Sequence, residues 1–442
     1  MSAAPPIDVG QEIDEAPLRG LQILAFGLCF LVAMLDGFDT QAIAFVAPAI
    51  AEAWNIPGNA FGPVFSAALV GLMVGQVLFG LVSDRFGRRL VIIASTLMFG
   101  VLTLCTGFAK DWNALLALRF LAGIGLGGAI PNVMAMTSEF APRRHQATLI
   151  ALVFAGFPLG AVVGGYLSIL MLPTHGWPSV FFLGGIAPVV LTLLLLILLP
   201  ESPRFLVQRP NRQAALIATM RRITGRDLDA GTRFTAEEAK VERLPLIELF
   251  RGGRAARTLT LWPIFFLSLL VIYFLLSWLP LLLKQRGLTI EGAISASVAL
   301  NLGGAVGGVI LGRFVDRYNP VTVLGGAYGV GAACIFAIGM VADQPWLLTL
   351  AVIGAGFCSV GAQTALCAFT ASLYPTSVRS TGLGSALAVG RIGSVIGPVA
   401  GGALLASGLA VQGIFAAVAS PALVSTVLFL ALRSQRAPEV SA

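Results

Sequence analysis

The sequence carries little charge. Of its 442 residues only 11% are Asp, Glu, Lys or Arg, whereas soluble domains carry about 25%. Hydrophobic residues make up 57% of the chain, above the roughly 45–50% of ordinary soluble domains. This balance excludes a soluble globular domain and is typical of an integral membrane protein.

Residues that bind metals or form disulfides are also scarce. The chain has two histidines and five cysteines, and the cysteines share no ligand spacing. We find no Ser/His/Asp, metal-binding or nucleotide-binding pattern. We therefore expect no enzyme activity, no cofactor, no metal site and no disulfide framework.

Long apolar runs are abundant. A helix needs roughly 20 apolar residues to cross about 30 Å of hydrocarbon. Twelve such runs predict an all-α integral membrane protein with twelve transmembrane helices. The fifth and eleventh runs are interrupted by Gly and Pro, which membrane helices tolerate when neighbours satisfy the freed backbone groups. The runs are 21–47, 61–82, 90–109, 113–136, 146–171, 179–199, 259–283, 294–314, 321–341, 346–371, 381–407 and 411–432.

Basic residues predict the orientation. Of the 28 Lys and Arg residues, 23 fall on the side that holds both termini and three on the opposite side. Because cytoplasmic loops are the basic ones, we expect both termini in the cytoplasm and a location in the plasma membrane, the inner membrane of a bacterium. This topology explains the net charge of +7, so we expect no nucleic-acid partner. Residues 1–20 lack a secretory signal and predict a mobile tail.

An internal repeat divides the chain. GLVSDRFGRR at 80–89 returns as GRFVDRYNP at 312–320, and the segment from Gly156 has a counterpart from Gly390. Paired repeats with a substrate site at their interface are typical of secondary transporters. The predicted parts are an N-terminal cytoplasmic tail 1–20, six-helix halves 21–200 and 259–432, a cytoplasmic central loop 201–258 and a C-terminal cytoplasmic tail 433–442.

Three motifs resemble those of the major facilitator superfamily. They are G-x-x-x-D-R-x-G-R-R at 80–89, R-x-x-x-G-x-G-x-G at 119–127 and PESPRF at 200–205. The element DGFD at 36–39, followed by Gln41, is similar to the first helix of the aromatic acid:proton symporters. The resemblance implies the major facilitator fold and proton-coupled import of an aromatic carboxylate, such as a hydroxybenzoate, by alternating access.

Two acids interrupt the first apolar run. A charge at the centre of a membrane helix costs on the order of 2.5–3.5 kcal/mol, so Asp36 and Asp39 need a reason to be there. Their spacing of three places them next to each other on one helix face, and Gly37 permits close approach of another helix. We predict a role in proton coupling for Asp36 and Asp39, without deciding which carries the proton. The alternative is an ion pair that only holds helices together.

Arg119 is the predicted partner of Asp39. It lies roughly 9 Å and Asp39 roughly 13 Å below the outer surface, at 1.5 Å of rise per residue. The resemblance implies a role of Arg119 in proton coupling. The alternative is that its side chain extends to the lipid headgroups.

Arg391 is the predicted anchor for the substrate. It lies roughly 15 Å into the eleventh run, at the midplane, and its counterpart in the first repeat is Phe157. A guanidinium can bind a carboxylate through two parallel hydrogen bonds. The alternative is a permanent ion pair with Asp36 or Asp39.

Aromatic and polar side chains are candidates for the rest of the substrate site, where they would stack on or hydrogen-bond a substituted ring. Each is also consistent with ordinary packing. The candidates are Phe38, Gln41, Tyr273, Trp278, Asn301 and Gln363.

The cytoplasmic motifs predict a gate. The resemblance implies that they latch the outward-facing state, with Asp84 near the N-terminal end of the eleventh helix. Glu139 has either a structural role or a role in proton coupling. Asn319 and Pro320 replace later basic residues of the motif, so the second-half latch should be weaker. The gating candidates are Gly80, Asp84, Arg85, Gly87, Arg88, Arg89, Arg143, Arg144, Asp316 and Arg379.

Other functions fit the same architecture. A transporter of sugars or aliphatic carboxylates, or a drug exporter, is the first alternative, and a membrane receptor without transport is the second. For the main hypothesis the partners are a small aromatic carboxylate, protons and membrane lipid, and we expect a monomer.

Overall fold

The computed structural model describes residues 7–229, 232–235, 246–251, 254–375 and 378–434. The remaining residues, including most of the predicted C-terminal tail and part of the central loop, lie outside this description. Among the described residues, twelve helices are long and apolar enough to cross a membrane. The predicted all-α architecture with twelve membrane helices is confirmed.

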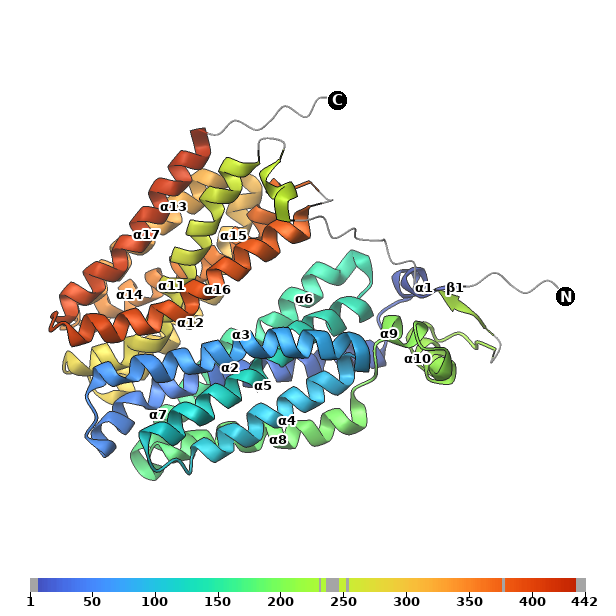
Figure 1. Cartoon of the computed structure of the whole chain (residues 1–442), viewed down its shortest axis with the longest axis horizontal. Helices are drawn as coiled ribbons and strands as arrows, with labels where there is room; N and C mark the ends of the chain where they lie inside the picture. Colours follow the sequence, from blue (N-terminus) through green and yellow to red (C-terminus); the bar gives the residue numbers. More distant parts are fainter. Residues whose placement is uncertain (1–6, 230–231, 236–245, 252–253, 376–377, 435–442) are drawn as a thin grey trace. The chain divides into compact units, whose positions relative to one another are not determined.

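The first six spans are formed by seven helices (Figure 1). These are α2 (Gly20–Trp54), α3 (Phe61–Phe86), α4 (Arg88–Thr106), α5 (Trp112–Phe140), the pair α6 (Gln146–Phe154) and α7 (Gly156–His175), and α8 (Pro178–Leu198).

The last six spans also comprise seven α-helices. These are α11 (Ala255–Gln285), α12 (Ile290–Arg317), α13 (Pro320–Met340), the pair α14 (Pro345–Gly356) and α15 (Ala362–Leu373), α16 (Arg379–Ala406) and α17 (Val411–Ser434). The short elements are β1 (Ile7–Asp8), α1 (Val9–Glu15), η1 (Gly58–Ala60), η2 (Arg143–His145), α9 (Pro203–Val207), η3 (Pro210–Arg212), α10 (Gln213–Thr224), β2 (Phe234–Thr235), η4 (Leu246–Phe250) and η5 (Phe357–Gly361).

The two apolar runs that contain Gly and Pro behave differently. The fifth span breaks between α6 and α7, whereas the eleventh, α16, runs unbroken through Pro398. Its glycines serve packing instead, because a Cβ at Gly393 would lie 2.1 Å from the Phe266 carbonyl oxygen of α11. The tenth span contains the π-helix η5 between α14 and α15.

The chain forms two compact units that do not follow the sequence repeats. Unit 1 comprises Met1–Thr40, Val70–Gly160 and Phe181–Lys240, and unit 2 comprises Gln41–Leu69, Ala161–Val180 and Val241–Ala442. Each unit is described by itself below.

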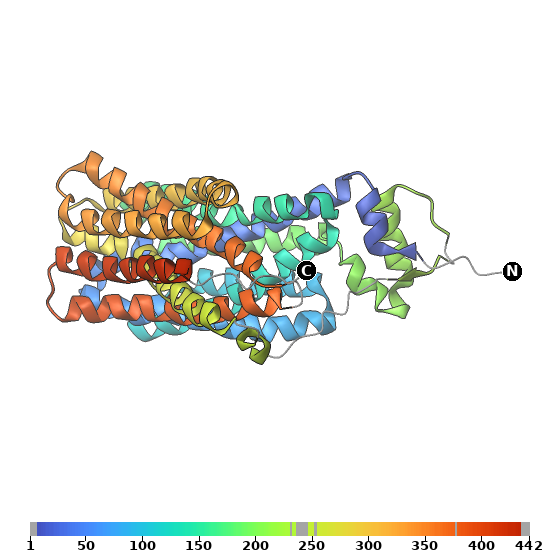
Figure 2. The ribbon, with the colours of Figure 1, turned by 90° about the horizontal axis from the view of Figure 1, so that it is seen from above.

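In unit 1 the N-terminal segment is folded against the central loop. Strand β1 pairs in parallel with β2, and α1 lies beside α10 (Figures 1 and 2). Val9 and Ile13, one turn apart on α1, are buried in the same hydrophobic cluster as Leu216 and Met220 of α10. The expected mobile tail is therefore wrong for residues 7–15, whose apolar face has a partner in the central loop.

Charged residues of the N-terminal segment complete this contact. Glu12 forms a salt bridge of 3.0 Å with Arg226, and Asp14 one of 3.3 Å with Arg143. The Asp8 side chain caps α1 by accepting a hydrogen bond from the Gln11 N–H. Two acids of the predicted tail thus bind Arg143, which follows α5, and Arg226 of the central loop.

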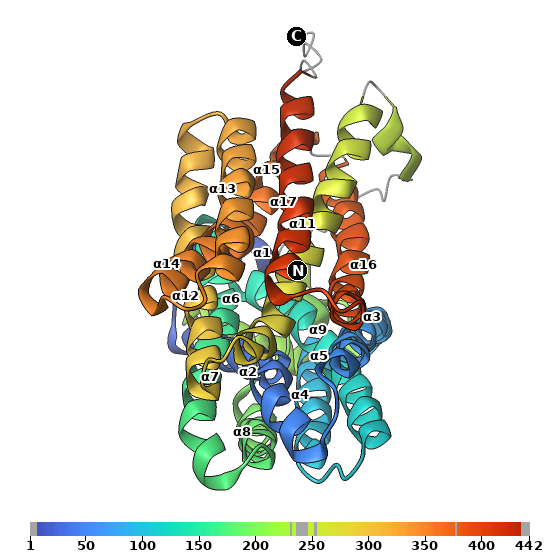
Figure 3. The same ribbon diagram turned by 90° about the vertical axis from the view of Figure 1, so that its left-hand side faces the viewer.

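In unit 2, α11 lies beside α16 and α13 beside α17 (Figure 3). The first part of the chain contributes to this unit through Gln41–Leu69. The Ser66 hydroxyl donates to the Val395 carbonyl oxygen at 2.8 Å, and the rings of Phe65 and Trp278 meet edge to face at 5.3 Å. These contacts hold the start of α3 against α11 and α16.

Candidate functional site

Asp39 and Arg119 form a buried salt bridge in unit 1. Nη1 of Arg119 lies 3.3 Å from Oδ1 and 3.4 Å from Oδ2 of Asp39. Both side chains are only 1% exposed. The predicted pairing is confirmed, and burial of Arg119 rules out the alternative in which it extends to the lipid headgroups.

Two threonines of α4 complete this pair. The Thr103 hydroxyl accepts a hydrogen bond from Nη2 of Arg119 at 3.1 Å and donates to Oδ1 of Asp39 at 2.5 Å. The Thr106 hydroxyl accepts from the same Nη2 at 2.8 Å. The guanidinium also faces the ring of Phe181, with its central carbon 4.9 Å from the ring centroid.

This arrangement balances charge in a site shielded from water. A buried ion pair adds little net stability, but removing one of its charges leaves the other uncompensated. Protonation of Asp39 would leave the charge of Arg119 uncompensated, while the threonine hydroxyls would still hold the guanidinium. The arrangement can therefore convert a protonation event into a change of electrostatic balance.

Asp36 and Phe38 lie on the same helix as Asp39. Asp36 is 1% exposed and accepts a hydrogen bond from the Thr40 hydroxyl at 3.3 Å. At Gly37 a Cβ would lie 1.9 Å from the Phe157 carbonyl oxygen, so the predicted close approach of another helix is confirmed and that helix is α7. Phe38 is buried, and its ring faces Gly184 of α8.

Arg391 and Tyr273 come together in unit 2. Nη1 of Arg391, on α16, donates to the Tyr273 hydroxyl of α11 at 3.1 Å. Within the described residues of unit 2, the guanidinium forms this hydrogen bond and no salt bridge. Both side chains are half-buried. A fixed cation in this membrane helix thus has donors left for an anion.

Gln41 is also in unit 2, where it is 1% exposed. Neither its amide nitrogen nor its amide oxygen has a hydrogen-bond partner among the described residues. A buried polar group without a partner costs about 1–3 kcal/mol. The polar group of a ligand would remove this cost, which supports the prediction for Gln41.

Other predicted site residues of unit 2 already have partners. The Trp278 indole N–H donates to the Pro398 carbonyl oxygen at 2.9 Å, and the ring is fully buried. The Asn301 amide donates to the Ser297 carbonyl oxygen at 2.9 Å. Gln363 accepts a hydrogen bond from the Ser268 hydroxyl at 2.7 Å. The bond made by Trp278 favours a packing role for it.

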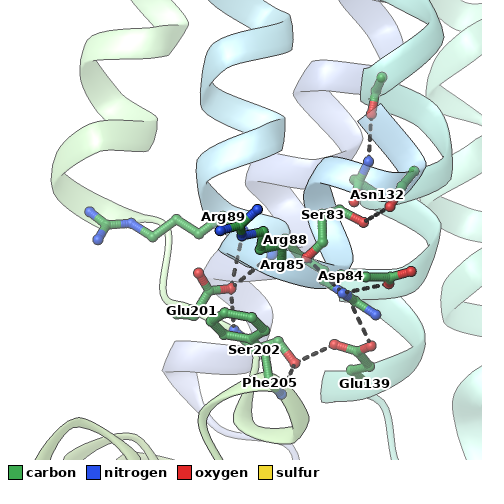
Figure 4. Close-up of polar contacts among 12 residues, drawn as sticks. Ser83, Asp84, Arg85, Arg88, Arg89, Asn132, Glu139, Glu201, Ser202 and Phe205 are labelled. Atoms are coloured by element: carbon green, nitrogen blue, oxygen red, sulfur yellow. Dashed lines mark hydrogen bonds and ion pairs between the residues drawn. The ribbon is translucent and has the colours of Figure 1, made fainter. Parts of the chain in front are cut away.

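At the N-terminal end of α4 in unit 1, Glu201 caps the helix (Figure 4). Its Oε1 accepts hydrogen bonds from the backbone N–H groups of Arg88 and Arg89, each at 3.1 Å. Gly87 precedes them with φ of 100°, and a Cβ there would lie 2.3 Å from Oε2 of Glu201. Burial raises the pKa of the Glu201 carboxyl above its ordinary value, and the backbone hydrogen bonds oppose this shift.

Glu139 joins the predicted gating residues in the same network (Figure 4). It accepts a hydrogen bond from the Ser202 hydroxyl and forms a salt bridge of 3.4 Å with Nε of Arg88. Nη1 of Arg88 also contacts Asp84 at 3.2 Å. These bonds favour a structural role for Glu139.

The other gating candidates make further contacts. Arg144 donates to the Ala16 carbonyl oxygen at 3.3 Å, so it binds the N-terminal segment as Arg143 does. Arg89 donates to the Leu196 carbonyl oxygen of α8 at 2.6 Å, and the Arg85 guanidinium lies over the Phe86 ring. The Gly80 carbonyl oxygen accepts from the Ser83 hydroxyl at 3.0 Å, and the Ser83 carbonyl oxygen accepts from Nη1 of Arg88 at 2.9 Å, so Gly80 is linked to this network (Figure 4). Asp316 and Arg379 belong to unit 2. The proximity of Asp84 to the start of α16 stays a prediction.

The sequence matches a family model described as Major Facilitator Superfamily over residues 29–362 and 299–442. The chain is a member of the major facilitator superfamily. This family comprises transporters and not enzymes, so the expectation of no enzyme activity is confirmed.

Known aromatic acid transporters are similar to this superfamily member over nearly its full length. The gallate transporter of Pseudomonas putida is 40% identical, covering 99% of this chain and 98% of the relative. The 4-hydroxybenzoate transporter PcaK of the same organism is 36% identical, covering 96% of each chain. The 3-(3-hydroxy-phenyl)propionate transporter of Escherichia coli is 36% identical, covering 94% of each. The chain therefore belongs to the aromatic acid branch of the superfamily.

Solved structures of other superfamily members have the same fold. The xylose transporter XylE of E. coli matches with a TM-score of 0.71 and 18% identity, covering 93% of this chain and 99% of XylE. A bacterial homolog of the human lysosomal transporter Spinster matches with a TM-score of 0.69 and 18% identity, covering 95% of this chain and 99% of the homolog. At this identity the likeness concerns the fold alone.

Sequence reasoning missed several polar residues of this superfamily member. Thr103 and Thr106 stand three residues apart in an apolar run, a spacing that places both on one helix face. Glu201 and Ser202 lie within PESPRF, which we used only to recognise the family. The two threonines could have been found as polar residues within an apolar run. Glu201 and Ser202 could have been found by considering each residue of the motif separately.

Proposed function

We propose that this protein imports an aromatic carboxylate of the hydroxybenzoate type together with protons, by alternating access across a bacterial inner membrane. In this proposal both termini are cytoplasmic and the working unit is a monomer. The transported substrates named for the relatives support the substrate class.

Arg391 would bind the substrate's carboxylate. The observation that carries this assignment is the guanidinium held by Tyr273 without a salt bridge among the described residues of its unit. A guanidinium binds a carboxylate through two parallel hydrogen bonds, a geometry that a lysine cannot reproduce. Gln41, with its buried unpartnered amide, would bind another polar group of the substrate.

Asp39, Arg119 and Asp36 would couple proton entry to substrate entry. Protonation of Asp39 would leave the charge of Arg119 uncompensated, and protonation of Asp36 would remove a second negative charge from the same helix; both changes make the transporter more favourable to an anion. Coupling requires that proton and substrate each bind one state of the transporter better than the other. The buried Asp39–Arg119 pair supports this role, because its balance changes when one member is neutralised.

The cytoplasmic network of Asp84, Arg88 and Glu139 would stabilise one of these states. The salt bridges among these residues and the cap that Glu201 provides for α4 support this role. Asp316 and Arg379 would serve the second half in the same way.

Uptake into proteoliposomes tests the proposal. Labelled benzoate, 4-hydroxybenzoate, gallate and xylose would be offered with and without an imposed pH gradient. We expect accumulation of the aromatic carboxylates only with the gradient, and none of xylose. Arg391→Ala should abolish this uptake and Arg391→Lys should reduce it, whereas Arg313→Ala, the change of an exposed arginine in the same unit, should not. Accumulation of xylose, or full uptake by Arg391→Ala, would contradict the proposal.

A further inference from the structure

A chain of side-chain hydrogen bonds links three helices of unit 2. The Tyr328 hydroxyl of α13 donates to the Ser268 hydroxyl of α11 at 2.7 Å. The Ser268 hydroxyl donates in turn to Oε1 of Gln363 on α15, also at 2.7 Å. Tyr328 and Ser268 are buried, with 3% and 2% of their surface exposed.

These hydrogen bonds fix the orientation of the Gln363 amide. A serine hydroxyl has one hydrogen to donate, and here it points to Oε1 of Gln363. The amide nitrogen therefore faces the other way, with two hydrogens to donate. Its one partner among the described residues is Sγ of Cys367 at 3.9 Å, a weak acceptor. Gln363 is half-buried, so this end of the amide is presented as a donor.

The backbone that carries Gln363 is also held in place. The π-helix η5 ends at Gly361, two residues before Gln363. A Cβ at Gly361 would lie 2.6 Å from the Gly307 carbonyl carbon, so α12 packs directly against this turn. Single π-helical turns within membrane and soluble helices often occur at functional sites.

Gln363 lies in the neighbourhood of Arg391. Cys367 is four residues after Gln363, on the same face of α15, and contacts its amide. Gln363 and Arg391 are both bonded to α11, Gln363 through Ser268 and Arg391 through Tyr273. These two α11 residues are five positions apart, roughly 7.5 Å along the helix axis. A ligand whose carboxylate binds Arg391 would therefore have the Gln363 amide as a nearby hydrogen-bond donor.

We propose that Gln363, oriented by Ser268 and Tyr328, recognises a hydroxyl oxygen on the ring of the substrate. The inference rests on the proposed function, since it requires an aromatic carboxylate bound at Arg391. A ring hydroxyl oxygen accepts a hydrogen bond from an amide, and benzoate lacks this acceptor. Sites built to bind a substrate hydroxyl discriminate against analogues without it. Ser268 and Tyr328 are positioning residues in this scheme, because they act through Gln363.

The test compares KM values for benzoate, 3-hydroxybenzoate and 4-hydroxybenzoate in proteoliposomes. The variants are Gln363→Met, which keeps the side-chain shape, Ser268→Ala and Tyr328→Phe. We expect Gln363→Met and Ser268→Ala to raise the ratio of KM for a hydroxybenzoate to KM for benzoate, for at least one of the two hydroxybenzoates. The expected increase is about tenfold, which corresponds to the loss of one hydrogen bond. Tyr328→Phe should change the same ratio in the same direction by about threefold.

Ser420→Ala is the matched control, because this hydroxyl donates to Ala417 of its own helix. It should leave the KM ratio unchanged. Equal changes of KM for all three substrates, or no change, would overturn the inference and leave a hydrogen-bond chain that only braces the helices. A parent protein that takes up none of the three would instead overturn the proposed function.

Discussion

At the scale of single residues, the pairing of Asp39 with Arg119 could be predicted from the sequence. Charged residues are rare inside apolar runs, so the few that occur there must find each other or a cavity. The threonines that complete the pair could not be predicted, because a threonine in a membrane helix usually bonds to its own backbone. Thr96 and Thr137 do so, donating to Ile92 and Val133.

Thr103→Val should destabilise the protein by about 1–3 kcal/mol, because Asp39 loses a donor and Arg119 loses an acceptor in a buried site. Valine has nearly the same shape, so packing is preserved. Thr96→Val is the control, since the Thr96 hydroxyl bonds only to its own helix. Thermal unfolding in detergent measures both. Equal melting temperatures for the two variants would mean that Thr103 contributes nothing specific to the pair.

Glu201→Gln should keep or slightly raise the free energy of unfolding at neutral pH, whereas Glu201→Ala should lower it by about 1–3 kcal/mol. Glutamine can accept the same backbone hydrogen bonds without the buried charge that raises the pKa of Glu201. Alanine leaves those N–H groups without a partner. If glutamine were as destabilising as alanine, the charge and not the hydrogen bonds would hold the cap.

The effect of Glu201→Gln on stability depends on pH. The pKa of Glu201 is raised in the folded protein from an ordinary value of 4.5, so the folded state holds this proton more tightly than the unfolded state. The contribution of Glu201 to stability therefore falls as the pH rises from 4.5 through the raised pKa. The melting temperature of the parent relative to Glu201→Gln should be higher at about pH 5 than at about pH 7.5. The opposite order would contradict the raised pKa.

At the scale of elements, the sequence predicted the twelve membrane helices but not their local irregularities. Apolar runs of about 20 residues are a strong signal. The π-helix Phe357–Gly361 has no comparable signal, because the packing of Gly361 against Gly307 of α12 joins residues far apart in the sequence. The N-terminal segment was missed for a related reason. Its seven-residue helix α1 is too short to be stable alone and depends on α10, more than 200 residues later.

Gly361→Ala should therefore lower the melting temperature and reduce transport. The added methyl group would meet the backbone of α12 at 2.6 Å, so α15 and Gln363 would shift. Gly384→Ala in α16 is the matched control, because its Cβ position has no neighbour within 4 Å among the described residues, apart from the backbone of its own helix. Alanine is about 1 kcal/mol more favourable than glycine in a helix, so this control should be neutral or stabilising. Equal effects of the two changes would disprove a packing constraint at Gly361.

At the scale of the whole molecule, the transporter is proposed to couple two binding events through buried charges. The apolar runs and the repeat predicted twelve helices in two halves, and the resemblance of three motifs supplied the major facilitator fold. They were not enough to predict the compact units, because these depend on contacts such as that of Ser66 with Val395, far apart in the sequence.

The central claim is that the buried acid opposite Arg119 couples proton entry to substrate entry. Its most direct test compares the parent with Asp39→Asn in proteoliposomes, measuring both accumulation of labelled 4-hydroxybenzoate under a pH gradient and its exchange against substrate loaded inside. We predict that the variant loses accumulation but retains exchange, since the asparagine side chain does not bind and release a proton. Accumulation by Asp39→Asn equal to that of the parent would contradict the account.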